Sequence, residues 1–181
     1  MAGIGEPLPE FEIIGVKPGF NNREENGVSA FETLTHESFP GKWKVIFFYP
    51  KDFSALCPTE LAEFGRLAKE FADRDTVLLG GSVDNEHVKL AWRRDHKDLD
   101  RLPFWQFADM RGDLADGLDL RAPNGATYRY TFIVDPENVI QHIYATNMKV
   151  GRNPGDTLRV LDALQTGALC PCNREIGGAT M

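Results

Sequence analysis

The stretch YPKDFSALCPTELAEF, residues 49–64, decides the fold, because it joins a predicted strand to a predicted helix. Residues 43–49 (WKVIFFY) form a nearly continuous apolar run, which is typical of a central strand buried on both faces. Beyond the loop, apolar residues recur at intervals of three and four, which is the spacing of a helix. These residues are Leu61, Phe64, Leu67, Ala68 and Phe71.

Further elements follow in alternation. Residues 76–83 (TVLLGGSV) predict a second buried strand, and Asp84 is a candidate N-cap for a helix over residues 85–96. Residues 128–134 and 139–146 flank a DPEN turn and predict an antiparallel hairpin, followed by a helix. That last helix carries Leu158, Leu161 and Leu164.

The N-terminal segment also contains a strand pattern. Residues 9–16 and 28–35 alternate between apolar and polar, and the turn residues between them predict an N-terminal β-hairpin. After this hairpin the order βαβα, then ββα, is that of a thioredoxin-like α/β fold. We therefore predict a single thioredoxin-like domain over residues 1–181.

The composition and net charge exclude several classes of protein. The 181 residues are 42% hydrophobic and 26% charged, as in an ordinary globular domain, and the net charge of −7 argues against a nucleic-acid binder. No apolar stretch approaches the roughly 20 residues of a membrane span, and the N-terminus does not resemble a signal peptide. We expect a cytoplasmic protein. Three cysteines, an odd number, fit a secreted disulfide framework poorly.

Cys57 lies where a helix is expected to begin. Ser54 is a candidate N-cap, or the helix begins at Pro58 with Cys57 as its cap. Both registers place the sulfur near free N–H groups at the positive end of the helix dipole, where a nucleophilic thiolate is stabilised. The alternative is a small buried residue without chemistry. No histidine lies near in sequence, so a Cys–His hydrolase needs a distant base.

The C-terminal segment, residues 168–181 (ALCPCNREIGGATM), loses helix periodicity and accumulates Gly, Pro and Asn, which predicts a mobile tail. It contains Cys170 and Cys172. A zinc site usually needs four ligands, and neither a second close cysteine pair nor a nearby histidine cluster is present. We therefore expect no metal and no cofactor.

The loop resembles the peroxidatic site of the peroxiredoxins through Pro50-x-x-x-Ser54-x-x-Cys57 followed by residues 58–60 (PTE). Further motifs are similar in order and spacing to the alkyl hydroperoxide reductase C type of 2-Cys peroxiredoxin, over roughly residues 5–175. They are FFYPKDF, the DRD at 73–75, SVDNEHVKLAWRR, YRYTFIVDPENVIQ, VGRNP and LRVLDALQTGALCPCN.

This resemblance implies a thiol peroxidase that reduces hydrogen peroxide and organic hydroperoxides. Cys57 is implied to be the peroxidatic cysteine, which attacks the O–O bond and becomes a sulfenic acid. Ser54 matches the hydroxyl that orients the peroxide, and Pro50 the proline that shields the thiolate. Arg129 matches the arginine that stabilises the thiolate and the developing oxyanion.

Supporting roles follow from the same resemblance. Glu60 is expected to hold Arg129, Tyr49 to border the pocket, and Arg152 in VGRNP to be a second arginine. Trp92 also has a family counterpart, but an aromatic residue on an apolar helix face is usually core, so we do not expect it to be catalytic.

The tail is implied to complete the cycle. Cys170 matches the resolving cysteine, which forms a disulfide with Cys57, usually across a homodimer; Cys172 could resolve instead, relay the disulfide or do neither. Because a disulfide needs Cα atoms within about 7 Å, the first turn at Cys57 and the tail are expected to move. The reductant is expected to be thioredoxin, a flavoprotein disulfide reductase or a small C-x-x-C protein, and dimers can assemble into a ring.

Two other functions remain open. A thiol–disulfide oxidoreductase usually has C-x-x-C at the helix start, but the residue three after Cys57 is Glu60. A chaperone-like assembly would act independently of Cys57. The chain departs from the family pattern at Ala55 and Leu56, where many members have bulky residues, and Ser54 stands where threonine is commoner.

The sequence predicts that Cys57 resists overoxidation to sulfinic acid. Members sensitive to overoxidation have a Gly-Gly-Leu-Gly insertion and a terminal helix with Tyr-Phe. This chain has RGDLADGLDLRAPNG where the insertion would lie, and it ends at GGATM. We expect mass spectrometry during turnover at low peroxide to find the sulfenic and disulfide forms of Cys57. Rapid accumulation of the sulfinic acid would contradict the prediction.

Overall fold

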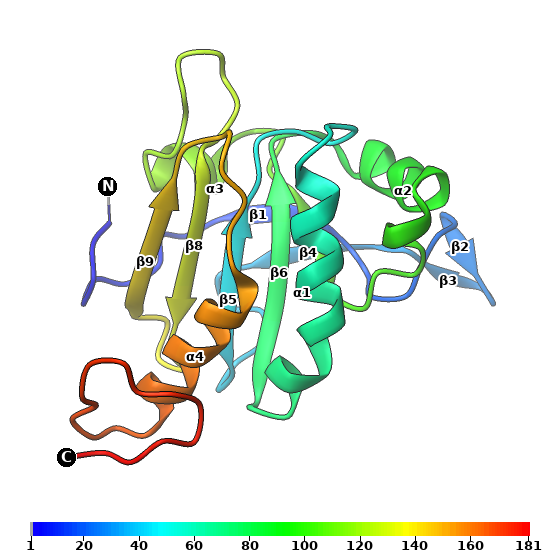
Figure 1. Cartoon of the computed structure of the whole chain (residues 1–181). Helices are drawn as coiled ribbons and strands as arrows, with labels where there is room; N and C mark the ends of the chain where they lie inside the picture. The colour runs from blue at the N-terminus through cyan, green and yellow to red at the C-terminus, as the bar shows by residue number, and fades with distance from the viewer. Residues whose placement is uncertain (1) are drawn as a thin grey trace.

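The computed structural model describes residues 2–181 and contains one seven-stranded sheet in the order β4-β1-β7-β6-β5-β8-β9. Figure 1 shows the helices packed against this sheet. The sheet strands are β1 (Glu12–Val16), β4 (Phe31–Thr35), β5 (Trp43–Phe48), β6 (Thr76–Ser82), β7 (Trp105–Ala108), β8 (Arg129–Val134) and β9 (Ile140–Thr146).

Strand β5 lies inside the sheet, parallel to β6 and antiparallel to β8. Its side chains alternate between two apolar clusters. Val45 and Phe47 pack in the cluster that contains Cys57, whereas Ile46 and Phe48 pack on the opposite face. The expected strand with both faces buried is therefore confirmed, and its end leads directly into the loop before Cys57.

Three helices carry or support the site: α1 (Cys57–Ala72), α2 (Glu86–Asp95) and α4 (Pro154–Gln165). Helices α1 and α4 lie side by side on the face of the sheet that contains Cys57 (Figure 1). A short helix, α3 (Asp113–Gly117), packs into the cluster on the other face. A 3-10 helix, η1 (Lys97–Leu99), follows α2. Across residues 2–181 no helix is both long and apolar enough to cross a membrane.

The expected thioredoxin-like α/β order is confirmed, with additions. Strands β1 and β4 pair antiparallel as the predicted N-terminal hairpin, and a small ribbon of β2 (Glu24–Glu25) and β3 (Val28–Ser29) lies between them. Strands β8 and β9 form the second predicted hairpin. Strand β7, which lies between β1 and β6 in the main sheet, was not predicted, and neither were the β2–β3 ribbon, α3 and η1.

The predicted N-caps are wrong: neither Ser54 nor Cys57 caps α1, and Asp84 does not cap α2. Helix α1 begins at Cys57, with Leu56 at the N-cap position and no capping side chain, while the Ser54 hydroxyl donates to the carbonyl of Lys51 at 2.9 Å. Helix α2 is capped by Asn85, whose side chain accepts from the N–H of Val88 at 2.9 Å. Ser54 thus bonds within its own loop, while the Asp84 carboxylate accepts from the main-chain N–H of Asp52, in the loop before Cys57, at 2.8 Å.

Two glycines of β6 allow aromatic rings to pack against the sheet. A Cβ on Gly80 would lie 2.3 Å from Cζ of Phe47, and one on Gly81 would lie 2.3 Å from Cδ2 of Phe107. The rings belong to opposite clusters, so the sheet is closely packed on both sides here. Any side chain at either glycine requires a ring to move.

Gly80→Ala should therefore destabilise the protein by about 1–3 kcal/mol, as overpacking of a core does. Gly65→Ala, in the middle of α1, is the control: its Cβ would meet Pro103 Cδ at 3.4 Å, an ordinary contact, and should add up to about 1 kcal/mol through helix propensity. Denaturant unfolding of both variants measures the difference. Equal effects of the two substitutions would contradict this account.

Candidate active site

Cys57 is the first residue of α1 and is 1% exposed. It comes one residue after the N-cap position, and Pro58 follows within the first turn, where a missing N–H costs little. The sulfur therefore lies at the positive end of a 16-residue helix, inside the core cluster of α1, β5 and α4. The arrangement favours a negative charge on or near the sulfur.

Arg129 lies beside this sulfur. It is the first residue of β8 and is 3% exposed, and its Nη1 lies 3.3 Å from Cys57 Sγ. The same nitrogen donates to Glu60 Oε2 at 2.7 Å, while Nε and Nη2 donate to the carbonyl of Met148 at 2.9 and 2.7 Å. All three nitrogens of the guanidinium are thus held, which fixes the position of Nη1 at the sulfur.

Glu60 joins this arginine to a second one. Arg152 directly precedes the Asn153 N-cap of α4, and its Nε and Nη2 donate to Oε1 and Oε2 of Glu60, each at 2.9 Å. Its main-chain N–H also donates to Oε1, at 2.8 Å. The two oxygens of one carboxylate therefore position residues from β8 and from the start of α4.

The charges of this cluster do not cancel. Burial alone raises a carboxyl pKa, but the hydrogen bonds and charge of Arg152, together with the charge of Arg129, hold the pKa of Glu60 below its ordinary value of 4.5. Glu60 is therefore ionised at neutral pH. One carboxylate facing two guanidinium groups leaves one positive charge in excess next to Cys57, and that charge can stabilise an anion there.

Comparison with known proteins agrees with this geometry. The model of the AhpC/TSA family matches residues 4–143. Alkyl hydroperoxide reductase C of Mycolicibacterium smegmatis is 43% identical over 180 residues, 98% of this chain and 92% of the relative. The chain belongs to the AhpC/TSA family.

Other similar proteins also match over nearly the full length of this chain. A thioredoxin peroxidase of Trypanosoma brucei rhodesiense is 34% identical over 99% of this chain and 90% of its own. Among solved structures, Mycobacterium tuberculosis AhpC has a TM-score of 0.87 and 42% identity, covering 96% of this chain and 98% of that one. Reduced 2-Cys peroxiredoxin of Plasmodium vivax has a TM-score of 0.88 at 26% identity, covering 98% and 92%. The resemblance to the peroxiredoxins and the thioredoxin-like fold are therefore confirmed.

The remaining predicted loop residues make no direct bond to the Cys57 sulfur. Tyr49, at the end of β5, is fully buried and shares the core cluster with Cys57, and its carbonyl accepts from Thr127 Oγ1 at 3.3 Å. Pro50 and Ser54 are half-buried. Trp92 is a buried core residue of the same cluster, as expected.

The tail cysteines lie at the other end of the domain. In Figure 1, α1 begins at the top of the view and the red tail lies at the bottom, beyond α4. Helix α4 has 12 residues and is therefore about 18 Å long. Its start, next to Arg152, lies that far from its end, where the tail begins. Cys170 Sγ lies 3.4 Å from Thr166 Oγ1, and Cys172 is exposed.

The tail is docked on α4 in this conformation. Arg174 is buried, and its Nη1 donates to Asp162 Oδ2 at 2.8 Å; the N–H of Gly177 donates to the same oxygen at 3.0 Å. The predicted mobility of residues 168–181 stays a prediction. In the described part of the chain, no group of three or more His, Cys, Asp and Glu side chains could hold a metal ion.

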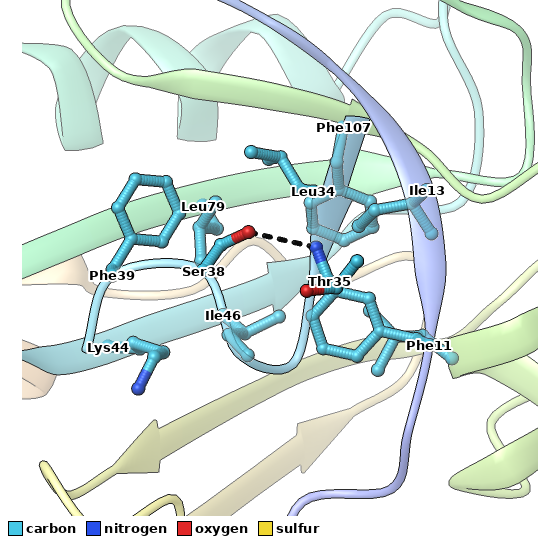
Figure 2. Close-up of a pocket in the computed structure, with 11 residues that line it drawn as sticks. Phe11, Ile13, Leu34, Thr35, Ser38, Phe39, Lys44, Ile46, Leu79 and Phe107 are labelled. Carbon is cyan, nitrogen blue, oxygen red and sulfur yellow. Dashed lines mark hydrogen bonds between the residues drawn. The ribbon is translucent and has the colours of Figure 1, made fainter. Parts of the chain in front are cut away.

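An apolar cavity elsewhere does not belong to this site. Figure 2 shows it between Leu34, Ile46, Leu79 and Phe107, with a volume of about 10 Å³, roughly one water molecule. These side chains pack in the cluster on the face of the sheet opposite to Cys57. The cavity therefore gives no route to the sulfur.

Two contributors to the site were not predicted from the sequence. The Met148 carbonyl fixes Arg129, but a main-chain acceptor leaves no mark in the sequence. The second is a buried ion pair between Asp52 and Lys89. Helix spacing could have indicated this pair, because Lys89 is adjacent to Leu90 and one turn before Arg93. The structure shows all three side chains buried.

Glu60→Gln should destabilise the protein by about 3–5 kcal/mol at neutral pH, because it leaves two buried arginines without a counter-charge. The folded-state pKa of Glu60 is lowered, so its stabilisation is present above pH 4.5 and declines as the pH falls through that lowered value. The difference between wild type and variant should therefore shrink in acid. Denaturant unfolding at several pH values measures it.

The matched control is Glu63→Gln on the exposed side of the same helix. Glu63 pairs only with Arg66, at 2.6 Å on the surface, so the substitution should change stability by at most about 0.5 kcal/mol. If Glu60→Gln were no more harmful than this control, the carboxylate would not be the anchor of the two arginines.

Proposed function

We propose that this chain is a thiol peroxidase that reduces hydrogen peroxide and organic hydroperoxides through Cys57. The observation that carries the proposal is the 3.3 Å contact between Arg129 Nη1 and Cys57 Sγ, together with the carboxylate that fixes this arginine. Membership of the AhpC/TSA family supports the same chemistry. The thiol–disulfide oxidoreductase alternative is disfavoured, because Glu60 occupies the second cysteine position and is engaged by the arginines.

In the first step the Cys57 thiolate attacks the terminal oxygen of the hydroperoxide. The S–O bond forms as the O–O bond breaks, and the leaving alkoxide or hydroxide takes a proton to become an alcohol or water. Arg129 stabilises both the thiolate and the negative charge that develops on oxygen. Ser54 orients the peroxide, Pro50 shields the sulfur from water, Tyr49 borders the pocket, and Glu60 and Arg152 support Arg129.

In the second step Cys170 attacks the sulfenic sulfur, a disulfide forms, and water leaves. The separation along α4 within one chain favours a Cys57 from a second chain as the partner, and hence a homodimer. Cys172 is exposed and can relay the disulfide or replace Cys170. A dithiol protein of the thioredoxin, flavoprotein or C-x-x-C kind then restores the thiols. Assembly of dimers into a ring and a cytoplasmic location complete the proposal.

The test adds one equivalent of hydroperoxide to the reduced protein, followed by non-reducing gel electrophoresis and peptide mass mapping. Wild type should give a disulfide between Cys57 and Cys170 of two chains. Cys57→Ser should keep its fold and lose peroxide consumption entirely.

Cys170→Ser and Cys172→Ser identify the resolving thiol. Loss of the interchain link only in Cys170→Ser assigns the role to Cys170 and leaves Cys172 accessory. If peroxide is consumed but Cys57 forms no disulfide with either tail cysteine, the tail assignment is wrong and another protein must resolve the sulfenic acid. Full consumption by Cys57→Ser would overturn the proposed function itself.

A further inference from the structure

A buried ion pair lies behind the loop that carries Cys57. Asp52 follows Pro50 by two residues in this loop, and Lys89 projects from α2. Lys89 Nζ lies 3.2 Å from Oδ1 and 3.1 Å from Oδ2 of Asp52, and both side chains are essentially unexposed. Neither group bonds the Cys57 sulfur, so any effect of the pair on the reaction passes through the loop.

The pair is tied to the sheet as well as to α2. Lys89 Nζ donates to Ser82 Oγ at 2.7 Å and to the Tyr49 hydroxyl at 3.4 Å, and Ser82 Oγ donates to Asp52 Oδ1 at 3.2 Å. The main-chain N–H of Asp52 donates to Asp84 Oδ2 at 2.8 Å. The loop is therefore held by both the side chain and the backbone of one residue.

The network continues toward the centre of the domain. The Tyr49 hydroxyl accepts from Gln106 Nε2 at 2.8 Å, and Gln106 Oε1 accepts from Arg93 Nε at 3.0 Å. Burial and the nearby Asp52 carboxylate raise the pKa of Tyr49 well above its usual range, so this hydroxyl stays neutral. The polar atoms behind the loop are therefore well satisfied, and a satisfied buried network is rigid.

The residue after Asp52 needs such a support. Phe53 has φ of 54°, in the left-handed region that a bulky residue rarely adopts, and it stacks on Trp92 with ring centroids 5.8 Å apart. Strained backbone persists only where its surroundings hold it. Asp52 on one side and Trp92 on the other supply that hold.

We propose that Lys89, acting through Asp52, is a positioning residue that keeps residues 50–56 in the conformation in which Cys57 reacts with peroxide. The inference rests on the proposed function. Opening the loop for disulfide formation draws Asp52 away from Lys89 and separates two buried charges, which is costly. The pair therefore speeds the peroxide step and slows the disulfide step.

Asp52→Asn combined with Lys89→Met tests the inference. The double variant removes both charges, because Lys89→Met alone leaves a buried carboxylate without a counter-charge and is the variant that would fail to fold. Stopped-flow tryptophan fluorescence separates a phase whose rate rises with peroxide concentration from a later phase that does not. The first should slow by about tenfold, as expected for a misplaced reacting group, and the second should become faster.

Two control variants test whether the effect depends on the location of the Asp52–Lys89 pair. Asp73→Asn with Lys69→Met removes an ion pair of the same residue types from the exposed surface of α1, and both phases should stay at the wild-type rates. Leu34→Ala enlarges the cavity of Figure 2 on the opposite face of the sheet and shows the effect of a general loss of stability. Both phases should keep their wild-type rates in this variant too, even where its melting temperature falls as far as that of the Asp52/Lys89 variant.

Unchanged phases in the Asp52/Lys89 variant would overturn the inference. So would Leu34→Ala, if it reproduced the same opposite shifts at an equal melting temperature. A wild-type protein with no peroxide-dependent phase at all would overturn the proposed function, and the inference with it. The wild-type trace therefore distinguishes the two failures.

Discussion

The buried carboxylate of Glu60 is the constraint on which the site depends. It is accessible to solvent over only 2% of its surface, and its two main partners are 69 and 92 residues away in sequence. A lone carboxylate in that place would be strongly disfavoured, so the first turn of α1 can pack only when β8 and the start of α4 deliver their arginines. Folding of the core and assembly of the site are therefore the same event.

The packing of strand β5 explains why the cluster of Glu60, Arg129 and Arg152 is held so closely in place. Strand β5 is covered on both faces and ends at Phe48, so the loop that follows starts from a closely packed part of the sheet. The guanidinium of Arg152 lies 5.1 Å from the ring of Phe47 on the same strand, which joins the charged cluster to the apolar core. Gly80 of β6 lets this ring approach the sheet. The packing of aromatic side chains therefore helps to hold the residues around the Cys57 sulfur in place.

Much of this architecture could be predicted from the sequence, because long apolar runs and alternating patterns report burial directly. Strand β7 was not predicted because it has only four residues and follows a polar segment with a proline. The cap at Ser54 was wrong because its hydroxyl bonds to the Lys51 carbonyl, and α1 begins without any capping side chain. The cap at Asp84 was wrong because Asp84 bonds to Asp52 and the neighbouring Asn85 caps α2. Arg129 and Glu60 emerged only from the resemblance to a family. A strand arginine and a helix glutamate are ordinarily surface residues, and periodicity gives no sign that they meet.

The length of α4 has a consequence for how electrons would pass through the molecule. Under the proposed function the peroxide reacts at a sulfur that is almost fully covered, whereas Cys172 is exposed at the opposite end of the domain. A reductant protein is far too large to reach Cys57 in this conformation, but it can reach the tail. The cysteine that must be protected from solvent and the cysteine that must meet another protein therefore have incompatible requirements. Under the proposed function, placing them at opposite ends of one chain and joining them across two chains would meet both requirements.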